Sequence, residues 1–195
     1  MPDFLLVGND PTLDLVNTEV ILAGVRTDLL QSFGDLTQWL EQANLASANE
    51  MQRLAKVWTD TPEARDTLQE VRALRSVLRQ AVERIAKTGR LPRELAGVLG
   101  KELQHPRLAT EVMQFQGKLR TKPRWVLEKP EDLLVPLAHC AASFFATADY
   151  RAIRKCENPR CILWFYDTSK NHSRRWCSME LCGNRAKATA FRERL

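Results

Sequence analysis

Four cysteines near the C-terminus constrain the fold of this chain more than any other feature. The protein has five cysteines among 195 residues, and none precedes Cys140. The last four form two pairs with four residues inside each pair and 15 residues between the pairs; they are Cys156, Cys161, Cys177 and Cys182. Two turns that each offer two thiolates can surround a metal ion as a tetrahedron. We therefore predict that the last 40 residues fold around a metal.

Zinc is the metal that this pattern favours. Four cysteine ligands leave no open coordination position, which is typical of a structural zinc site, and structural fingers use two to four residues between paired ligands. An iron–sulfur cluster can also bind four cysteines, and the spacing alone does not exclude it. A thioredoxin-type redox pair requires two-residue spacing in a βαβ context, which the sequence lacks. We predict one structural Zn²⁺ held by Cys156, Cys161, Cys177 and Cys182.

Positive charge is concentrated in the same segment. The chain has 29 Lys and Arg against 24 Asp and Glu, and residues 151–195 contain 11 of these basic residues but only four of the acidic ones. A strongly basic module on a near-neutral body favours a polyanionic partner. We predict nucleic-acid contacts from the cations of the expected hairpin and last helix, which are Arg174, Arg175, Arg185, Lys187, Arg192 and Arg194.

The C-terminal module is predicted as a treble-clef or ribbon-like finger. The aromatic run 162–166 and the segment 174–176 flank a polar stretch and suggest a β-hairpin between the cysteine pairs. A helix-forming segment follows Cys182, so the last ligand would lie at the start of a helix. Gly183 is expected to make a tight turn with a free φ angle. The aromatic residues form either the small core of the finger or a platform that stacks on unpaired bases; they are Trp164, Phe165, Tyr166 and Trp176.

The body, residues 1–150, is predicted to be mainly α-helical. Apolar residues at helical spacing place helices at 35–43, 48–58, 64–87, 92–103 and 131–150, after a short helix that begins at Asp10-Pro11. A small two-stranded element is expected between Pro106 and Pro130, with strands at 109–115 and 124–127 around a polar turn. The predicted fold class is therefore mainly α, with a small β-hairpin in the body and a zinc finger at residues 151–195.

Three polar residues interrupt the otherwise apolar N-terminal stretch: Asp14, Asn17 and Thr18. They form either a pocket for a small-molecule effector or a hydrogen-bonded network at a helix end. We do not expect an enzyme, because the chain has no Gly-rich phosphate loop, no GxSxG elbow and no HExxH motif.

The N-terminus and the apolar runs indicate a cytoplasmic protein without a membrane segment. No secretory signal is visible, and the longest apolar stretch, 137–148, is too short to span a bilayer. In a reducing compartment, clustered thiols indicate a metal site rather than disulfides.

Two segments resemble known families. The residues Arg174-Arg175-Trp176-Cys177 and Cys182-Gly183-Asn184-Arg185-Ala186-Lys187, together with Asp167-Thr168-Ser169, closely resemble the CGNR-type zinc finger of bacterial proteins. The opening Gly8-Asn9-Asp10-Pro11-Thr12-Leu13-Asp14-Leu15-Val16-Asn17-Thr18 is similar to the start of the ABATE domain, an α-helical domain that commonly precedes this finger. The resemblance implies a stress-related transcription regulator with a DNA-binding finger.

Two functions follow as hypotheses. In the first, a helical sensor or dimerisation body positions the zinc finger on DNA, with a small-molecule effector and a second copy of the chain as further partners. In the second, the protein is an RNA-binding or protein-interaction module with a purely structural zinc site. Its finger would then dock a partner through Trp164, Phe165 and Tyr166, and an exposed apolar patch on the finger would favour this alternative.

Overall fold

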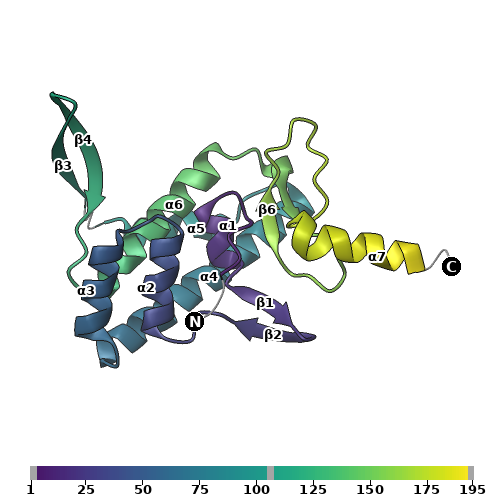
Figure 1. Cartoon of the computed structure of the whole chain (residues 1–195), viewed down its shortest axis with the longest axis horizontal. Helices are drawn as coiled ribbons and strands as arrows, with labels where there is room; N and C mark the ends of the chain where they lie inside the picture. Colours follow the sequence, from purple (N-terminus) through teal and green to yellow (C-terminus); the bar gives the residue numbers. More distant parts are fainter. Residues whose placement is uncertain (1–3, 105–107, 193–195) are drawn as a thin grey trace.

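A helical body precedes a small C-terminal module in the computed structural model, which describes residues 4–104 and 108–192 (Figure 1). The helices are α1 (Pro11–Val16), α2 (Phe33–Gln42), α3 (Ala48–Trp58), α4 (Pro62–Thr88), α5 (Glu94–Glu102), α6 (Leu134–Thr147) and α7 (Asn184–Arg192). The strands form antiparallel pairs, which are β1 (Glu19–Leu22) with β2 (Val25–Asp28), β3 (Leu108–Phe115) with β4 (Lys118–Trp125), and β5 (Ile153–Lys155) with β6 (Trp164–Tyr166). The predicted fold class, mainly α with a finger-like C-terminal module, is confirmed.

Capping residues fix the ends of the predicted helices. Ser47 and Glu50 form a reciprocal capping box at the start of α3, and Ser32 and Asp35 form another at the start of α2. Each box satisfies backbone amides that have no partner inside the helix. α4 ends at Gly89, whose φ of 67° is a left-handed conformation that glycine adopts without strain.

α4 is the central helix of the body. It packs against α1, α2, α5 and α6 and also contacts β5 of the C-terminal module. Buried residues of both parts belong to one apolar cluster, which includes Leu78 of α4, Phe144 of α6 and Phe165 of β6. The body and the C-terminal module therefore share a continuous core.

The β3–β4 hairpin lies in the predicted region, but its second strand begins earlier than expected. β4 covers Lys118–Trp125, so the polar stretch 117–123 that the sequence suggested as a turn is largely strand. The chain reverses at Gln116 and Gly117, whose φ values of 50° and 74° suit a tight hairpin turn. The described side chains in the first half of β4 are exposed, and a strand exposed to water lacks the apolar pattern that marks a buried one.

The β1–β2 hairpin is not predicted by the sequence. Its register places Glu19 opposite Asp28, and two arginines of α4 bind these carboxylates. Arg75 lies 2.6 Å from Asp28, and Arg79 lies 3.1 Å from Glu19. These ion pairs join residues that are far apart in the sequence. A local sequence pattern therefore cannot predict that they stabilise the hairpin.

A turn of 3₁₀ helix, η1 (Pro130–Leu133), precedes α6, and together they account for most of the predicted buried helix. Cys140 of α6 lies half-buried, and burial raises the pKa of its thiol to about 11. His139 packs edge-on against Trp125, with 5.1 Å between the ring centroids. Within the ranges 4–104 and 108–192, no helix has both the length and the hydropathy needed to cross a membrane.

Candidate metal centre and its attachment to the body

The four predicted cysteines meet in one cluster. Their Sγ atoms all lie within 4.8 Å of one another, and those of Cys161 and Cys177 are 3.9 Å apart. Four sulfurs bound to zinc at about 2.3 Å would lie about 3.8 Å from each other, whereas a disulfide would bring two of them to about 2.0 Å. The donor set and its spacing therefore fit one structural zinc ion.

The first knuckle, which is the turn that carries Cys156 and Cys161, lies at the tip of the β5–β6 hairpin. The amide of Cys156 donates to the carbonyl of Leu163 at 2.9 Å, and the amide of Cys161 donates to the carbonyl of Asn158 at 2.9 Å. Further backbone amides, those of Asn158 and Leu163, donate to the sulfurs of Cys156 and Cys161. Such hydrogen bonds stabilise thiolates and orient them for a metal.

The hairpin of the finger surrounds the first cysteine pair and does not lie between the two pairs, so the predicted pairing is wrong. Residues 164–166 pair with residues 153–155, not with residues 174–176. The latter segment runs beside the first knuckle instead, where the carbonyl of Arg175 accepts a hydrogen bond from the amide of Glu157 at 3.0 Å. This contact holds the two knuckles together.

The second knuckle is a short π-helical turn, η3 (Met179–Gly183), that leads into α7. The side chain of Ser178 accepts a hydrogen bond from the amide of Leu181 at 2.9 Å and caps the turn. The carbonyl of Ser178 accepts from the amide of Cys182 at 3.2 Å. The last cysteine therefore lies at the start of the final helix, as predicted.

Gly183 does not adopt a positive φ angle, so the predicted turn with a free φ angle is wrong. Its φ is not among the positive values of the described backbone. A Cβ atom at this position would lie 2.6 Å from the sulfur of Met179 and 3.2 Å from the ring of Trp176. Glycine allows these two side chains to pack closely over the turn that presents Cys182.

The clustered thiols compete for ionisation. Cys156 accepts hydrogen bonds from the thiols of Cys161 and Cys177, which lower its pKa, and the same contacts raise the pKa of both donors. A divalent cation ends this competition because it binds all four sulfurs as thiolates and releases their protons. The cluster is thus suited to a metal and unsuited to four free thiolates.

Asp167 organises the loop between the cysteine pairs, although the sequence interpretation assigned it no role. This buried carboxylate accepts hydrogen bonds from the amide and hydroxyl of Ser169 at 3.0 and 2.6 Å and from the amide of Arg174 at 3.0 Å. Burial alone would raise the pKa of Asp167, but these hydrogen bonds outweigh it and lower the pKa. The sequence Asp-Thr-Ser is typical of such a turn, so it could have predicted this role of Asp167.

Comparison with known families agrees with this geometry. The model of the ABATE family, described as putative stress-induced transcription regulator, matches residues 9–148.

This protein belongs to the ABATE family. The model of the CGNR zinc finger follows at residues 152–195 and includes all four clustered cysteines. The two matches occur in the order that the sequence resemblance predicted. No curated protein matches the chain.

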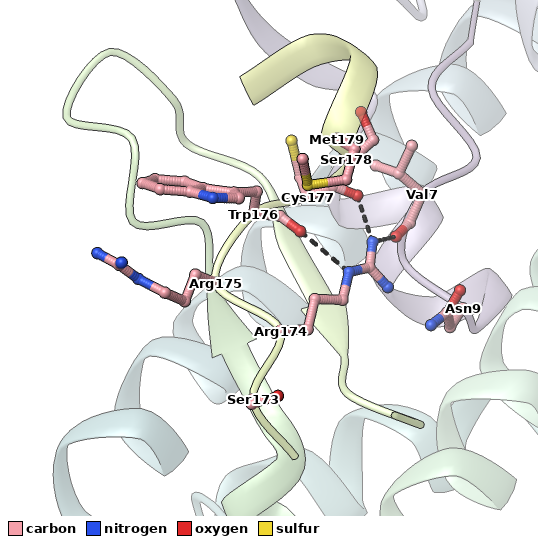
Figure 2. Close-up of a pocket in the computed structure, with 9 residues that line it drawn as sticks. All are labelled: Val7, Asn9, Ser173, Arg174, Arg175, Trp176, Cys177, Ser178 and Met179. Carbon is pink, nitrogen blue, oxygen red and sulfur yellow. Dashed lines mark hydrogen bonds between the residues drawn. The ribbon is translucent and has the colours of Figure 1, made fainter. Parts of the chain in front are cut away.

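Arg174 of the CGNR finger is engaged in internal contacts, as Figure 2 shows. Its guanidinium donates to the carbonyls of Val7 at 2.9 Å, Trp176 at 3.0 Å and Cys177. The same group lies 4.2 Å from the ring centroid of Phe165. These contacts give the guanidinium a structural role, and the nucleic-acid contact of Arg174 stays a prediction.

Arg174 and its neighbours also line a cavity of about 610 Å³ between the finger and the N-terminal segment of the body (Figure 2). The cavity is lined by Val7, Asn9, Ser173, Arg174, Arg175, Trp176, Cys177, Ser178 and Met179.

The cations of α7 are exposed. Arg185 and Lys187 lie near the start of the helix and Arg192 at its end, and α7 points away from the body in Figure 1. Among the residues that the structure describes, no carboxylate forms an ion pair with any of these three. Arg194 lies outside the described residues.

The aromatic residues of the finger are mostly internal. Trp164 and Phe165 are 3% and 0% exposed, so the apolar docking surface that the second hypothesis requires does not exist at these positions. Trp176 is half-buried, and the exposed Arg175 stacks on it at 5.0 Å while also pairing with Glu157 at 2.5 Å.

The N-terminal segment of the ABATE body pairs with strand β6 of the finger. The carbonyl of Gly8 accepts a hydrogen bond from the amide of Tyr166 at 2.8 Å, and the side chain of Asn9 donates to the carbonyl of Tyr166 at 3.0 Å. The buried Asn17 side chain both donates to the carbonyl of Trp164 and accepts from its amide, each at 2.8 Å. The body therefore completes the hydrogen bonding of a strand in the finger.

Asp14 and Thr18 belong to the same buried network. Asp14 accepts a hydrogen bond from the amide of Gly8 at 2.7 Å, and burial raises the pKa of this carboxyl to about 6. Thr18 accepts from Arg75 at 2.9 Å and donates to a backbone carbonyl one turn earlier in the chain. The structure favours the helix-end network over an effector pocket, since these two residues and Asn17 do not line the cavity described above.

Proposed function

We propose that this protein is a DNA-binding transcription regulator whose CGNR finger contacts duplex DNA through α7. The observation that carries the proposal is the set of exposed cations on this helix, which lack carboxylate partners among the described residues. Uncompensated cations on a helix that projects from the surface can neutralise phosphates without first breaking internal ion pairs. Membership of the ABATE family supports the same role.

The geometry of α7 suits a DNA groove. A helix of nine residues is about 13 Å long, and the major groove of B-DNA, about 12 Å wide, admits an α-helix. Arg185 and Arg192 share one face because seven residues separate them, whereas Lys187 lies on the other side of the helix. Cations on both sides of a helix match the phosphates that line both walls of a groove, so we assign phosphate contacts to these residues.

The remainder of the finger serves to hold α7 in place. The metal centre fixes the turn that begins the helix, and Arg174, Asn17 and the Gly8 carbonyl attach the finger to the body. Arg175 is a further exposed cation beside the second knuckle, but it is paired with Glu157. The sensor or dimerisation role of the body stays a prediction that the oligomeric state in solution will test.

Binding of the zinc-loaded full-length chain to duplex DNA tests the proposal. We expect fluorescence anisotropy to show an affinity that falls steeply between about 50 and about 200 mM salt. The double variant Arg185→Gln with Lys187→Gln should lower the log–log salt slope by about 1.8, because each lost phosphate contact removes about 0.9. The matched control replaces two exposed lysines of the body, Lys56 and Lys87, by Gln and should bind as the wild type does. Absence of salt-dependent binding by the wild type overturns the proposal.

A further inference from the structure

The β3–β4 hairpin extends from the body as a two-stranded arm (Figure 1). Each strand has eight residues, so the arm, Leu108–Trp125, is about 26 Å long. Almost every described side chain along β3 is exposed. The arm therefore adds little to the core of the body and presents both of its faces to a partner.

The base of the arm is fixed to the body. Arg124 forms an ion pair with Glu50 of α3 at 2.8 Å, and the neighbouring Trp125 packs against His139 of α6. Just beyond the arm, Arg53 of α3 donates to the carbonyl of Leu127 at 2.5 Å. These contacts hold the base of the arm against the body, and the described side chains of its tip half are exposed.

The tip of the arm is cationic. Residues 112–121 include Lys118 and Arg120 and contain no Asp or Glu. The register places Phe115 opposite Lys118 and Met113 opposite Arg120, so these four side chains share one face. The guanidinium of Arg120 lies 5.7 Å from the ring centroid of Phe115, which is 53% exposed.

A face of this composition matches nucleic acid. Lysine and arginine bind phosphates, and an exposed aromatic ring beside an arginine adds a stacking surface. The opposite face carries exposed apolar side chains, Val112 and Leu119, that suit contact with the methyl groups of thymine. The major groove admits a two-stranded β-ribbon as well as a helix.

We propose that the β3–β4 arm is a second DNA-binding element, which contacts the phosphates of duplex DNA through Lys118 and Arg120. This inference rests on the proposed function, because the arm would hold the same duplex as α7. Figure 1 shows the arm and α7 at opposite ends of the molecule, so the two elements contact different segments of the DNA. The arm gives the helical body a direct part in binding.

The test compares four full-length, zinc-loaded proteins on a duplex of about 40 base pairs. They are the wild type, an arm variant with Lys118→Gln and Arg120→Gln, the finger variant with Arg185→Gln and Lys187→Gln, and the body control with Lys56→Gln and Lys87→Gln. We expect the arm variant to bind on the order of ten- to thirtyfold more weakly, with a salt slope lower by about 1.8. The body control should stay within about twofold of the wild type, and circular dichroism should show the same fold for all four.

The outcomes separate the arm from the finger. If the wild type binds and the finger variant loses affinity while the arm variant matches the body control, the arm proposal is overturned and the proposed function stands. If the wild type does not bind duplex DNA, the proposed function fails and the arm proposal fails with it.

A variant of the apolar face of the hairpin, which carries Val112 and Leu119, provides the last part of the test. Val112→Thr with Leu119→Ser is expected to leave the oligomeric state in sedimentation unchanged. Conversion of a dimer to a monomer by this variant, combined with normal DNA binding by the charge variant, would assign the arm to contact between two copies of the chain and overturn the proposal.

Discussion

Two side chains, Asn17 and Arg174, join the ABATE body to the finger by hydrogen bonds to backbone groups. The side chain of Asn17 is 1% exposed and forms hydrogen bonds with both the backbone amide and the backbone carbonyl of Trp164. Removal of such a side chain leaves two buried backbone groups without partners, each at a cost of about 1–3 kcal/mol. At the residue scale, the attachment of the finger thus depends on a few hydrogen bonds from Asn17 and Arg174 to the backbone.

Substitution of Asn17 by Ala is expected to lower the free energy of unfolding by about 2–4 kcal/mol. Urea denaturation of the zinc-loaded protein measures the change. Asn49→Ala, at an exposed position of α3, is the control and should alter stability by less than about 0.5 kcal/mol. A loss of similar size in both variants would contradict the role assigned to Asn17.

Arg174→Gln should reduce the free energy of unfolding by about 2–3 kcal/mol, because hydrogen bonds from a charged group are lost inside the finger. Arg185→Gln, on the exposed face of α7, should leave stability unchanged and weaken DNA binding. Thermal denaturation and anisotropy on both variants distinguish the two roles. If the Arg174 variant is instead as stable as the wild type and loses DNA affinity, the result would show that Arg174 contacts DNA.

Asp14 should make stability depend on pH. Its carboxyl has a pKa of about 6 in the folded protein against an ordinary value of 3.8, so ionisation is more costly in the folded state than in the unfolded chain. The stability that Asp14 contributes is complete below about pH 4 and is lost as the pH rises through 6. We expect Asp14→Asn, which keeps an oxygen for the Gly8 amide, to gain roughly 2–3 kcal/mol relative to the wild type between pH 4 and 7. Equal stability curves for both proteins would show that the carboxyl is not held in this environment.

At the scale of elements, the helices and the β3–β4 hairpin were predictable from the sequence, whereas the β1–β2 and β5–β6 pairings were not. The apolar spacing of α3 and α4 lies within each helix and their capping residues lie directly beside them, so the sequence locates both helices to within about two residues. The β1–β2 hairpin depends on Arg75 and Arg79, which lie about 50 residues further along the chain.

The four cysteines of the candidate metal site were predictable from spacing alone, but their surroundings were not. Strand β6 pairs with residues before the first cysteine, and its outer edge is bound by Asn17. Arg174 likewise takes a partner, Val7, from the far end of the chain. Contacts of this kind arise only when the tertiary fold brings the two ends of the chain together.

The π-helical turn η3, which precedes α7, offers a test at the scale of elements. Ser178→Ala removes the cap of the turn that carries Cys182, which should cost about 1 kcal/mol and weaken zinc binding roughly fivefold in competition with a chelator. Ser47→Ala removes the corresponding cap of α3 and should cost similar stability without changing zinc affinity. If both variants bind zinc equally well, the cap does not position the cysteine.

On the scale of the whole molecule, the single core implies that metal binding and body stability are coupled. Phe165 and the buried cysteines belong to the same apolar cluster as the helices of the body. A ligand that binds only the folded state stabilises everything that unfolds with its site. The finger and the body should therefore unfold as one cooperative unit.

Chelation of zinc should lower the unfolding temperature of the entire protein, including signals from the body such as the near-ultraviolet circular dichroism of the buried Trp39. Cys182→Ser should have the same effect, whereas Cys140→Ser, which leaves the cluster intact, should not. Two separate transitions, with the one from the body insensitive to chelator, would show that the two parts are independent.

The pairing of the N-terminal segment with β6 also has a consequence for biosynthesis. Gly8 and Asn17 precede their partners Tyr166 and Trp164 by about 150 residues, so a ribosome makes them well before these partners. Such long sequence separation slows folding, because the chain must close a large loop before these contacts form. The helices that precede β6 can assemble during translation, but the edge that binds β6 has no partner until residues 164–166 have been made. A nascent chain, or one terminated before β6, would thus expose this edge to chaperones and proteases, whereas a chain that includes β6 covers it.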